Sequence, residues 1–114
     1  MATIYKIVSA ALWRAAKTSG AFTGAPVDHA DGFIHFSGAD QLRETAARHF
    51  AGQDDLLLAA VDADMLGEAL KWETSRGGAL FPHLYAMLLL SAVLWVQPLP
   101  LDAAGGHVFP ELAA

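Results

Sequence analysis

Hydrophobic and polar residues follow short, regular patterns along this chain, and in its first half these patterns predict alternating strands and helices. Residues 4–8 (IYKIV) are β-branched or aromatic around one lysine, which is typical of a strand. Ser9 follows and can cap a helix over residues 10–18, whose apolar positions share one face. Gly20 then favours the left-handed backbone that ends a helix.

The next stretch predicts a loop, a strand and a second helix. Residues 21–31 (AFTGAPVDHAD) contain glycine, proline and two aspartates, so we expect a loop there. Residues 33–36 form the second expected strand. Ser37 comes next and is placed to cap a helix over residues 39–50.

The second half of the chain predicts more strands than helices. Residues 56–61 (LLLAAV) are continuously apolar, which indicates a strand buried on both faces. The other expected elements are one helical turn at residues 64–67, a short strand or loop at 70–73, a turn at 75–78, and strands at 84–90 and 92–99. The tail of residues 102–114 shows no periodicity and is expected to pack loosely.

The order of these elements predicts the fold class. Helices come early and strands dominate late, which favours an α+β domain over a regular parallel α/β domain. We expect a single domain over residues 1–114, with a mixed sheet of about five or six strands and two main helices.

Composition and charge narrow the class of ligand. Apolar residues make up 54 % of the chain and charged residues 17 %, which is typical of a globular protein. The net charge is −5 and the seven Lys and Arg residues are scattered, so a nucleic-acid partner is not expected. A small uncharged or locally recognised ligand fits better, although one arginine in a cleft can still hold a phosphate.

The sequence also bears on location. There is no cysteine, which excludes disulfides and thiolate chemistry. The start of the chain lacks the pattern of a signal peptide, and the longest apolar run, residues 86–96, is about half of what a membrane span needs. We expect a soluble cytoplasmic protein that does not enter membranes. The oligomeric state stays open.

Two apolar runs, GFIHFS and FPHLY, carry the candidate chemistry. Because side chains alternate across a strand, an aromatic, a histidine and a hydroxyl share one face in each run: Phe33, His35 and Ser37 in the first, Phe81, His83 and Tyr85 in the second. If both faces line one cleft, it has a few polar groups on apolar walls, as small-molecule sites do. We take His35, His83 and Tyr85 as catalytic candidates.

A structural interpretation of the same residues is also open. A strand histidine is often half-buried with one hydrogen bond to main chain, and Ser37 has a role as helix cap. Pro82 lacks a backbone donor, so the second run is expected to start at a sheet edge or to leave a loop.

A second group of candidates surrounds the glycine-rich SRGG stretch. Glu73 is a candidate general base or hydroxyl acceptor, Trp72 a platform for a planar ring, and Arg76 a clamp for a carboxylate or phosphate. The alternative is a surface pair of Lys71 with Glu73 and a solvated loop arginine.

Known catalytic motifs are absent. The chain has no P-loop, GxGxxG, GxSxG or HExxH pattern. Residue types that bind metals occur without a recognised spacing, namely His29, His35, His83, Asp28 and Asp31. No metal is expected, and a metal-assisted hydrolase is the weakest of the candidate functions.

Several segments together resemble a known bacterial family. IYKI, GFIHFS, ETAARHFAGQDDLLLAAVDAD, LKWE and GGALFPHLY occur in the order found in the family called domain of unknown function 952. Members often carry histidine at the position of Lys6, and Gly-Pro where this chain has Ala86-Met87.

That family is similar to the ADP-ribosyltransferase superfamily, and the resemblance implies a split, mixed sheet that holds NAD in a central cleft. Lys6 would stand where the superfamily keeps a histidine or arginine, and the glutamate of its late strand has no clear equivalent in LYAMLLL. His35 and Tyr85 would orient the ribose or the leaving nicotinamide.

The remaining candidates are assigned to binding the nucleotide. Trp72 or a phenylalanine such as Phe33 would stack on a ring, and Arg76 would hold phosphate. Ser37, Glu73 and Lys6 complete the candidate ligand contacts.

The sequence leaves three functions open. The first is an enzyme, or a degenerate enzyme, that binds NAD or a related nucleotide. The second is a non-catalytic module that binds another small molecule or a protein. The third is the metal-assisted hydrolase.

Overall fold

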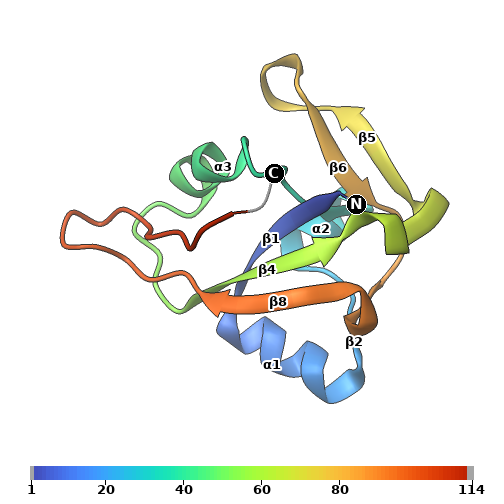
Figure 1. The fold of residues 1–114 in the computed structure, drawn as a ribbon, viewed down its shortest axis with the longest axis horizontal. Coiled ribbons are helices and arrows are strands. Elements are labelled where there is room, and N and C mark those ends of the chain that lie inside the picture. Colours follow the sequence, from blue (N-terminus) through green and yellow to red (C-terminus); the bar gives the residue numbers. More distant parts are fainter. Residues whose placement is uncertain (1, 113–114) are drawn as a thin grey trace.

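The computed structural model describes residues 2–112, with the side chain of Arg76 left out, and its elements are shown in Figure 1. In chain order they are β1 (Thr3–Ser9), α1 (Ala10–Ser19), β2 (Ala21–Phe22), α2 (Pro26–Asp31), β3 (Ile34–His35), α3 (Leu42–His49), β4 (Leu56–Asp62), β5 (Leu70–Thr74), β6 (Leu80–Leu84), β7 (Leu88–Leu89) and β8 (Val93–Pro98). Three 3₁₀ segments, Ala63–Ala69, Arg76–Gly78 and Leu90–Ala92, connect neighbouring strands.

The described strands form three small sheets, ordered β1-β4-β8, β2-β7 and β3-β6-β5. The α+β class is confirmed, but one mixed sheet of five or six strands is wrong, because every pairing is antiparallel. Strands β2, β3 and β7 have two residues each, too few to join the sheets into one. A single antiparallel bridge between Tyr5 and Ser37 links β1 to the segment that follows β3.

Strand alternation in β1 and β4 divides the core in two. Ile4 and Val8 face one cluster with Trp13 of α1, whereas Tyr5 packs on the other face with Leu42 of α3. Figure 1 shows α1 and α3 on opposite sides of these strands. Ala59 and Val61 of β4 belong to the first cluster, and Leu58 and Ala60 to the second. Both faces of β4 are therefore covered, which confirms the strand predicted to be buried on both sides.

The first helix forms where the sequence predicts it. Ser9 Oγ accepts a hydrogen bond from the Leu12 amide at 3.2 Å, and the Gly20 amide donates to the Ala16 carbonyl at 2.8 Å. Gly20 has φ of 90°, a left-handed conformation that ends the helix at little steric cost.

The predicted loop over residues 21–31 is wrong, since this stretch holds β2 and α2. Pro26 begins α2, where its missing amide is harmless, and Asp28 Oδ2 accepts a hydrogen bond from the Ala25 amide at 2.8 Å. Gly32, with φ of 86°, ends the helix. A helix of six residues is too short for a periodic apolar pattern to reveal it.

Ser37 is not the cap of the second predicted helix. The helix α3 begins at Leu42, later than predicted, and ends at His49. Ser37 instead exchanges two backbone hydrogen bonds with Tyr5, at 2.8 and 2.9 Å, and its Oγ lies 3.0 Å from Thr45 Oγ1. Backbone pairing with β1 therefore outweighs the capping preference of serine.

Of the two late strands, the one predicted over residues 92–99 is confirmed as β8, whereas the one predicted over residues 84–90 is wrong. The FPHLY run lies mostly in β6, while residues 88–98 divide into β7, a 3₁₀ turn and β8. Pro82 lies in the central strand of its sheet, not at an edge. The Pro82 carbonyl accepts a hydrogen bond of 3.0 Å from the Phe36 amide. Because β3 ends at His35, one residue earlier, the amide that Pro82 lacks would face no residue of β3, and its absence breaks no pairing with that strand.

The tail beyond β8 runs along the second core cluster, which contains Tyr5 and Leu42. Phe109 and Leu112 pack against that cluster, and an isolated bridge joins Leu101 to His107. Within the described residues, none of the helices has the length and apolar character to cross a membrane.

The cap of α1 makes a stability prediction. Ser9→Ala removes the acceptor of the Leu12 amide and is expected to lower the free energy of unfolding by about 1 kcal/mol. Urea denaturation measures the change. Ser91→Ala, at an exposed position, is the control and should stay within about 0.5 kcal/mol of the parent. Equal losses in both variants would contradict the capping role.

Candidate functional site

Aromatic and imidazole rings meet where β3 pairs with β6. His35 lies directly opposite His83 in the antiparallel register, so both side chains leave the same face of the sheet, with ring centroids 5.6 Å apart. The Phe33 ring stacks on His83 with centroids 4.0 Å apart. Phe33 also lies 4.6 Å from His35 and 5.3 Å from Tyr85, centroid to centroid. The four rings therefore form one cluster.

Glu73, on the neighbouring strand β5, holds one side of this cluster. Its Oε1 lies 2.8 Å from His83 Nδ1 and accepts a hydrogen bond of 2.7 Å from the Tyr85 hydroxyl. The bonds from Tyr85 and His83 hold the pKa of Glu73 below its usual value. Because a carboxylate only accepts, His83 Nδ1 carries the proton of this bond, which leaves Nε2 as the basic nitrogen of the neutral ring.

Asp28 holds the other side of the cluster from α2. Its Oδ1 lies 2.6 Å from His35 Nδ1 and accepts from the His35 amide at 3.1 Å. His35 Nε2 lies 2.8 Å from Asp31 Oδ2, one helical turn further along α2. Both ring nitrogens of His35 thus face carboxylates, and only the doubly protonated imidazolium donates to both.

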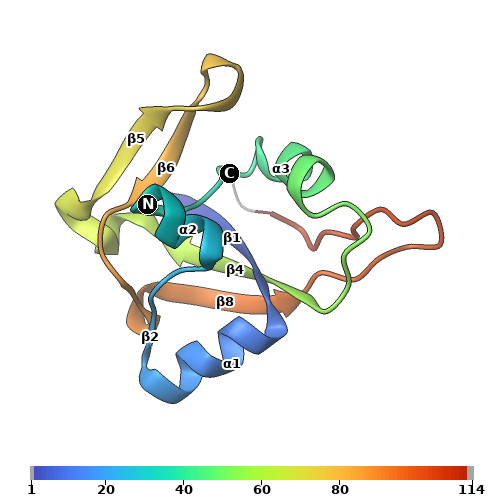
Figure 2. The same cartoon turned by 180° about the vertical axis from the view of Figure 1, so that it is seen from behind.

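The Asp28 carboxylate is itself buried and paired with a buried lysine. Lys6 Nζ donates to both Asp28 oxygens at 3.1 Å, and the two side chains are 7 % and 2 % exposed. Figure 2 shows α2 beside β1, which brings these residues together across 22 positions of sequence. Burial raises the pKa of Asp28, but the His35 hydrogen bond and the Lys6 charge outweigh it and lower that pKa to about 2. Burial lowers the pKa of Lys6, and Asp28 opposes this.

A cleft of about 920 Å³ opens beside the ring cluster. His35 and His83 line one wall, and the helix α3 contributes Arg48 and His49. Phe81 supplies apolar surface. Polar groups of both charges on a partly apolar wall are typical of a site for a small polar molecule.

The structure brings some of the remaining candidates to this cleft and separates others. Ser37 lines it but is buried, and Lys6 lines it with its ammonium held by Asp28. Trp72 pairs with Pro82 and lies on the opposite face of the sheet from Glu73, with 48 % of its surface exposed. The Arg76 side chain lies outside the described part of the structure.

The sequence pattern does not predict that Asp28 and Asp31 hold the His35 ring, or that α3 lines the cleft. The sequence offers Asp28 and Asp31 only as residue types that bind metals, because the segment that contains them predicts a loop. Nothing in the local pattern links Asp28 to Lys6. Within residues 2–112, the described side chains form no group of three or more His, Asp or Glu that could hold a metal ion. The metal-assisted hydrolase therefore finds no ligand set there.

The buried ion pair predicts a large stability effect. Asp28→Asn removes the charge that compensates Lys6 and is expected to lower the free energy of unfolding by about 3 kcal/mol. Urea denaturation measures it, with exposed Asp54→Asn as the matched control. The double variant Lys6→Met with Asp28→Asn should recover part of the loss. A single variant as stable as the control would contradict the pairing.

The same carboxylate predicts a pH dependence. Because the pKa of Asp28 is lowered from 3.8 to about 2, its contribution is complete above pH 3.8 and is lost as the pH falls towards 2. The stability difference between the parent and Asp28→Asn should therefore shrink over this window. Denaturation curves at several acidic pH values test it. A difference that stays constant would argue against an ionised Asp28.

The Glu73 bond predicts a change in tyrosine titration. It raises the pKa of Tyr85 above its usual 10.0, so Glu73→Gln should lower that pKa towards the usual value. The ultraviolet absorbance of the tyrosinate reports it, because Tyr5, the other tyrosine, is buried. Exposed Glu68→Gln should leave the curve unchanged, and an equal shift in both variants would contradict the contact.

Comparisons with known proteins identify a family and solved relatives. The model of the family described as "Protein of unknown function (DUF952)" matches residues 7–96. The crystal structure of protein CC0527 from Caulobacter crescentus is 57 % identical, with a TM-score of 0.90 and 93 % of each chain covered. The solution NMR structure of CC0527 is 58 % identical, with a TM-score of 0.84, over 93 % of this chain and 91 % of that one. No curated protein matches. The chain therefore belongs to the DUF952 family.

Proposed function

We propose that the cleft binds NAD or a related nucleotide, and that the chain is a small enzyme, or a degenerate enzyme, of the ADP-ribosyl-transferring or NAD-processing type. One observation carries the proposal. The ring centroids of His35 and His83 lie 5.6 Å apart on the wall of a cleft of about 920 Å³. One carboxylate oxygen of Glu73 is bonded to both His83 and Tyr85, and the Phe33 ring stacks on His83. That volume lies within the range of sites for small molecules and cofactors.

Glu73 is the group that best fits the chemistry. Cleavage of the bond between nicotinamide and ribose leaves positive charge on the ribose, and a nearby carboxylate stabilises such charge. Residues 84–90 (LYAMLLL) include no acidic residue, but Glu73 supplies a carboxylate from β5, beside His83. Glu73 does not itself line the cleft and adjoins it through His83, and its carboxylate is ionised at neutral pH.

The imidazoles take different roles in this proposal. His83, fixed by Glu73 through Nδ1, offers Nε2 as a hydrogen-bond acceptor or base. His35, whose two ring nitrogens are held by carboxylates, orients the ligand through the face of its ring and does not act as a base. Phe33 contacts both rings, stacked on His83 and tilted against His35. Arg48 on α3, whose Nε is bonded to Glu44 at 2.9 Å, would hold a phosphate at the rim with its other N–H groups.

Calorimetric titration tests the binding. We expect NAD or ADP-ribose to bind with a Kd below about 1 mM, and His35→Ala to weaken binding by about tenfold or more. His29→Ala is the matched control, because His29, on α2, is an exposed histidine that does not line the cleft. No saturable binding to the parent, or equal affinities in parent and His35→Ala, would reject the proposal.

Nicotinamide release separates an enzyme from a degenerate enzyme. Chromatography of NAD incubated with the chain should show release that falls in Glu73→Gln and persists in Glu68→Gln. Binding without release identifies the degenerate form. Release that Glu73→Gln leaves unchanged would refute the role of this carboxylate.

One observation favours the non-catalytic alternative, a module that binds a different small molecule. Both ring nitrogens of His35 are bonded to carboxylates, so this histidine has no nitrogen left for proton transfer. Native mass spectrometry of the purified chain tests this alternative. A co-purified ligand that is not a nucleotide, lost in His35→Ala, would support it over the NAD proposal.

A further inference from the structure

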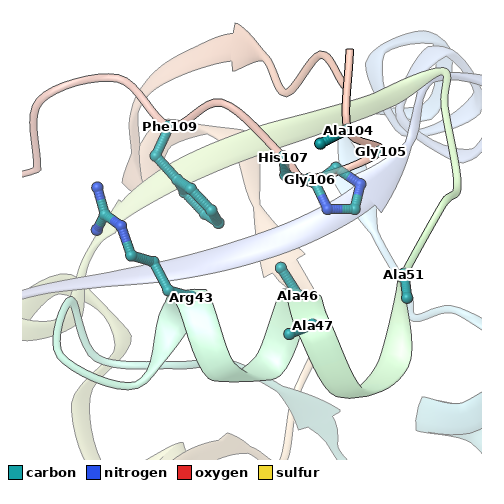
Figure 3. Close-up of a pocket in the computed structure, with 9 residues that line it drawn as sticks. All are labelled: Arg43, Ala46, Ala47, Ala51, Ala104, Gly105, Gly106, His107 and Phe109. Atoms are coloured by element: carbon teal, nitrogen blue, oxygen red, sulfur yellow. The ribbon is translucent and has the colours of Figure 1, made fainter. Parts of the chain in front are cut away.

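A second hollow lies between α3 and the C-terminal loop, away from the ring cluster (Figure 3). Its volume is about 410 Å³, and it shares no lining residue with the larger cleft. Small side chains create the space: Ala46, Ala47, Ala51, Ala104, Gly105 and Gly106. Arg43, His107 and Phe109 complete the lining.

The titratable residues of this lining are both basic, although the chain as a whole carries a charge of −5. The Arg43 guanidinium carbon lies 4.9 Å from the centre of the Phe109 ring, and Figure 3 shows the two side chains side by side at one end of the hollow. This contact holds the planar guanidinium against an apolar surface. Among the described residues, no carboxylate pairs with Arg43.

His107 lies at the other end, and a hydrogen bond fixes its ring. Nε2 is 2.9 Å from the carbonyl oxygen of Gln53, and because a carbonyl only accepts, Nε2 carries a proton. Nδ1 has no hydrogen-bond partner among the described residues. A ring anchored on one side and open on the other is suited to a polar contact with a ligand.

The loop that carries this histidine has a defined shape. Asp102 Oδ1 accepts from the Ala104 amide at 2.9 Å and from the Gly106 amide at 3.0 Å. The Asp102 amide donates to the Gly106 carbonyl at 2.7 Å, and Gly105 has φ of 85°, which suits glycine. The nearby carboxylate is thus occupied by loop amides, and the glycine wall of the hollow is held in place.

We propose that this hollow binds a small carboxylate with an apolar body. Arg43 contacts the carboxylate through paired N–H groups, and the alanines with Phe109 pack the apolar body. The open Nδ1 of the neutral His107 ring accepts from a donor group where the ligand body carries one. A single arginine matches the two oxygens of a planar carboxylate, whereas a phosphate dianion calls for more donors. The volume equals that of about 14 water molecules, so the ligand has at most about a dozen heavy atoms.

The test compares benzoate with its neutral isostere benzamide by NMR of the full ¹⁵N-labelled chain. Benzoate should shift the amide signals of Ala46, Ala47 and Gly106 saturably, whereas benzamide should bind at least about tenfold more weakly. Inorganic phosphate is the third probe. Equal binding of benzamide, tighter binding of phosphate, or shifts spread over the whole chain would overturn the proposal.

Two variants assign the contacts. Arg43→Gln should weaken benzoate by about tenfold, and Ala47→Leu should block the hollow without removing a charge. Arg14→Gln, at an exposed position on α1, is the control for charge and should bind as the parent does.

Amide spectra report that each variant is folded. Because the larger cleft shares no lining residue, NAD titration of Arg43→Gln should match the parent. Unchanged benzoate binding in both variants would refute the site.

Discussion

The buried carboxylate of Asp28 is the contact on which the ring cluster depends. It accepts from Lys6 on β1, from the amide that starts its own helix and from the amide and ring of His35. Three elements are thereby fixed by one side chain. Because its charge is matched by Lys6 in a region closed to water, neither partner can be removed without leaving an uncompensated charge.

The geometry of the cleft then follows from two short pairings. Tyr5 and Ser37 join the first sheet to the chain leaving β3, and the two-residue ladder of β3 with β6 sets His35 opposite His83. A shift of one position in that ladder would turn one imidazole to the other face of the sheet. Phe33 adds ring contacts to this short ladder, because it stacks on His83 and packs at a tilt against His35.

Local patterns predicted much of the fold, and long-range contacts account for most of the rest. The strand of IYKIV, the cap at Ser9 and the buried strand of LLLAAV rest on short-range preferences, and they occur as predicted. The helix α2 is too short for a periodic pattern, and the place of Ser37 depends on Tyr5, a partner far along the chain that one sequence does not reveal. The same holds in the site: strand alternation pointed to His35 and His83, but the lysine–aspartate pair joins segments with no shared pattern.

Helix α3 separates the two cavities, and this placement has a thermodynamic consequence. Arg43, Ala46 and Ala47 face the hollow, whereas Thr45, Arg48 and His49 face the larger cleft. With 3.6 residues per turn, these two sets lie on opposite sides of the helix. A guest on either side that displaces the helix changes the affinity of the other side, and linkage makes that effect equal in both directions. An eight-residue helix is thus the partition between the two proposed sites, and its displacement by one ligand would be felt by the other.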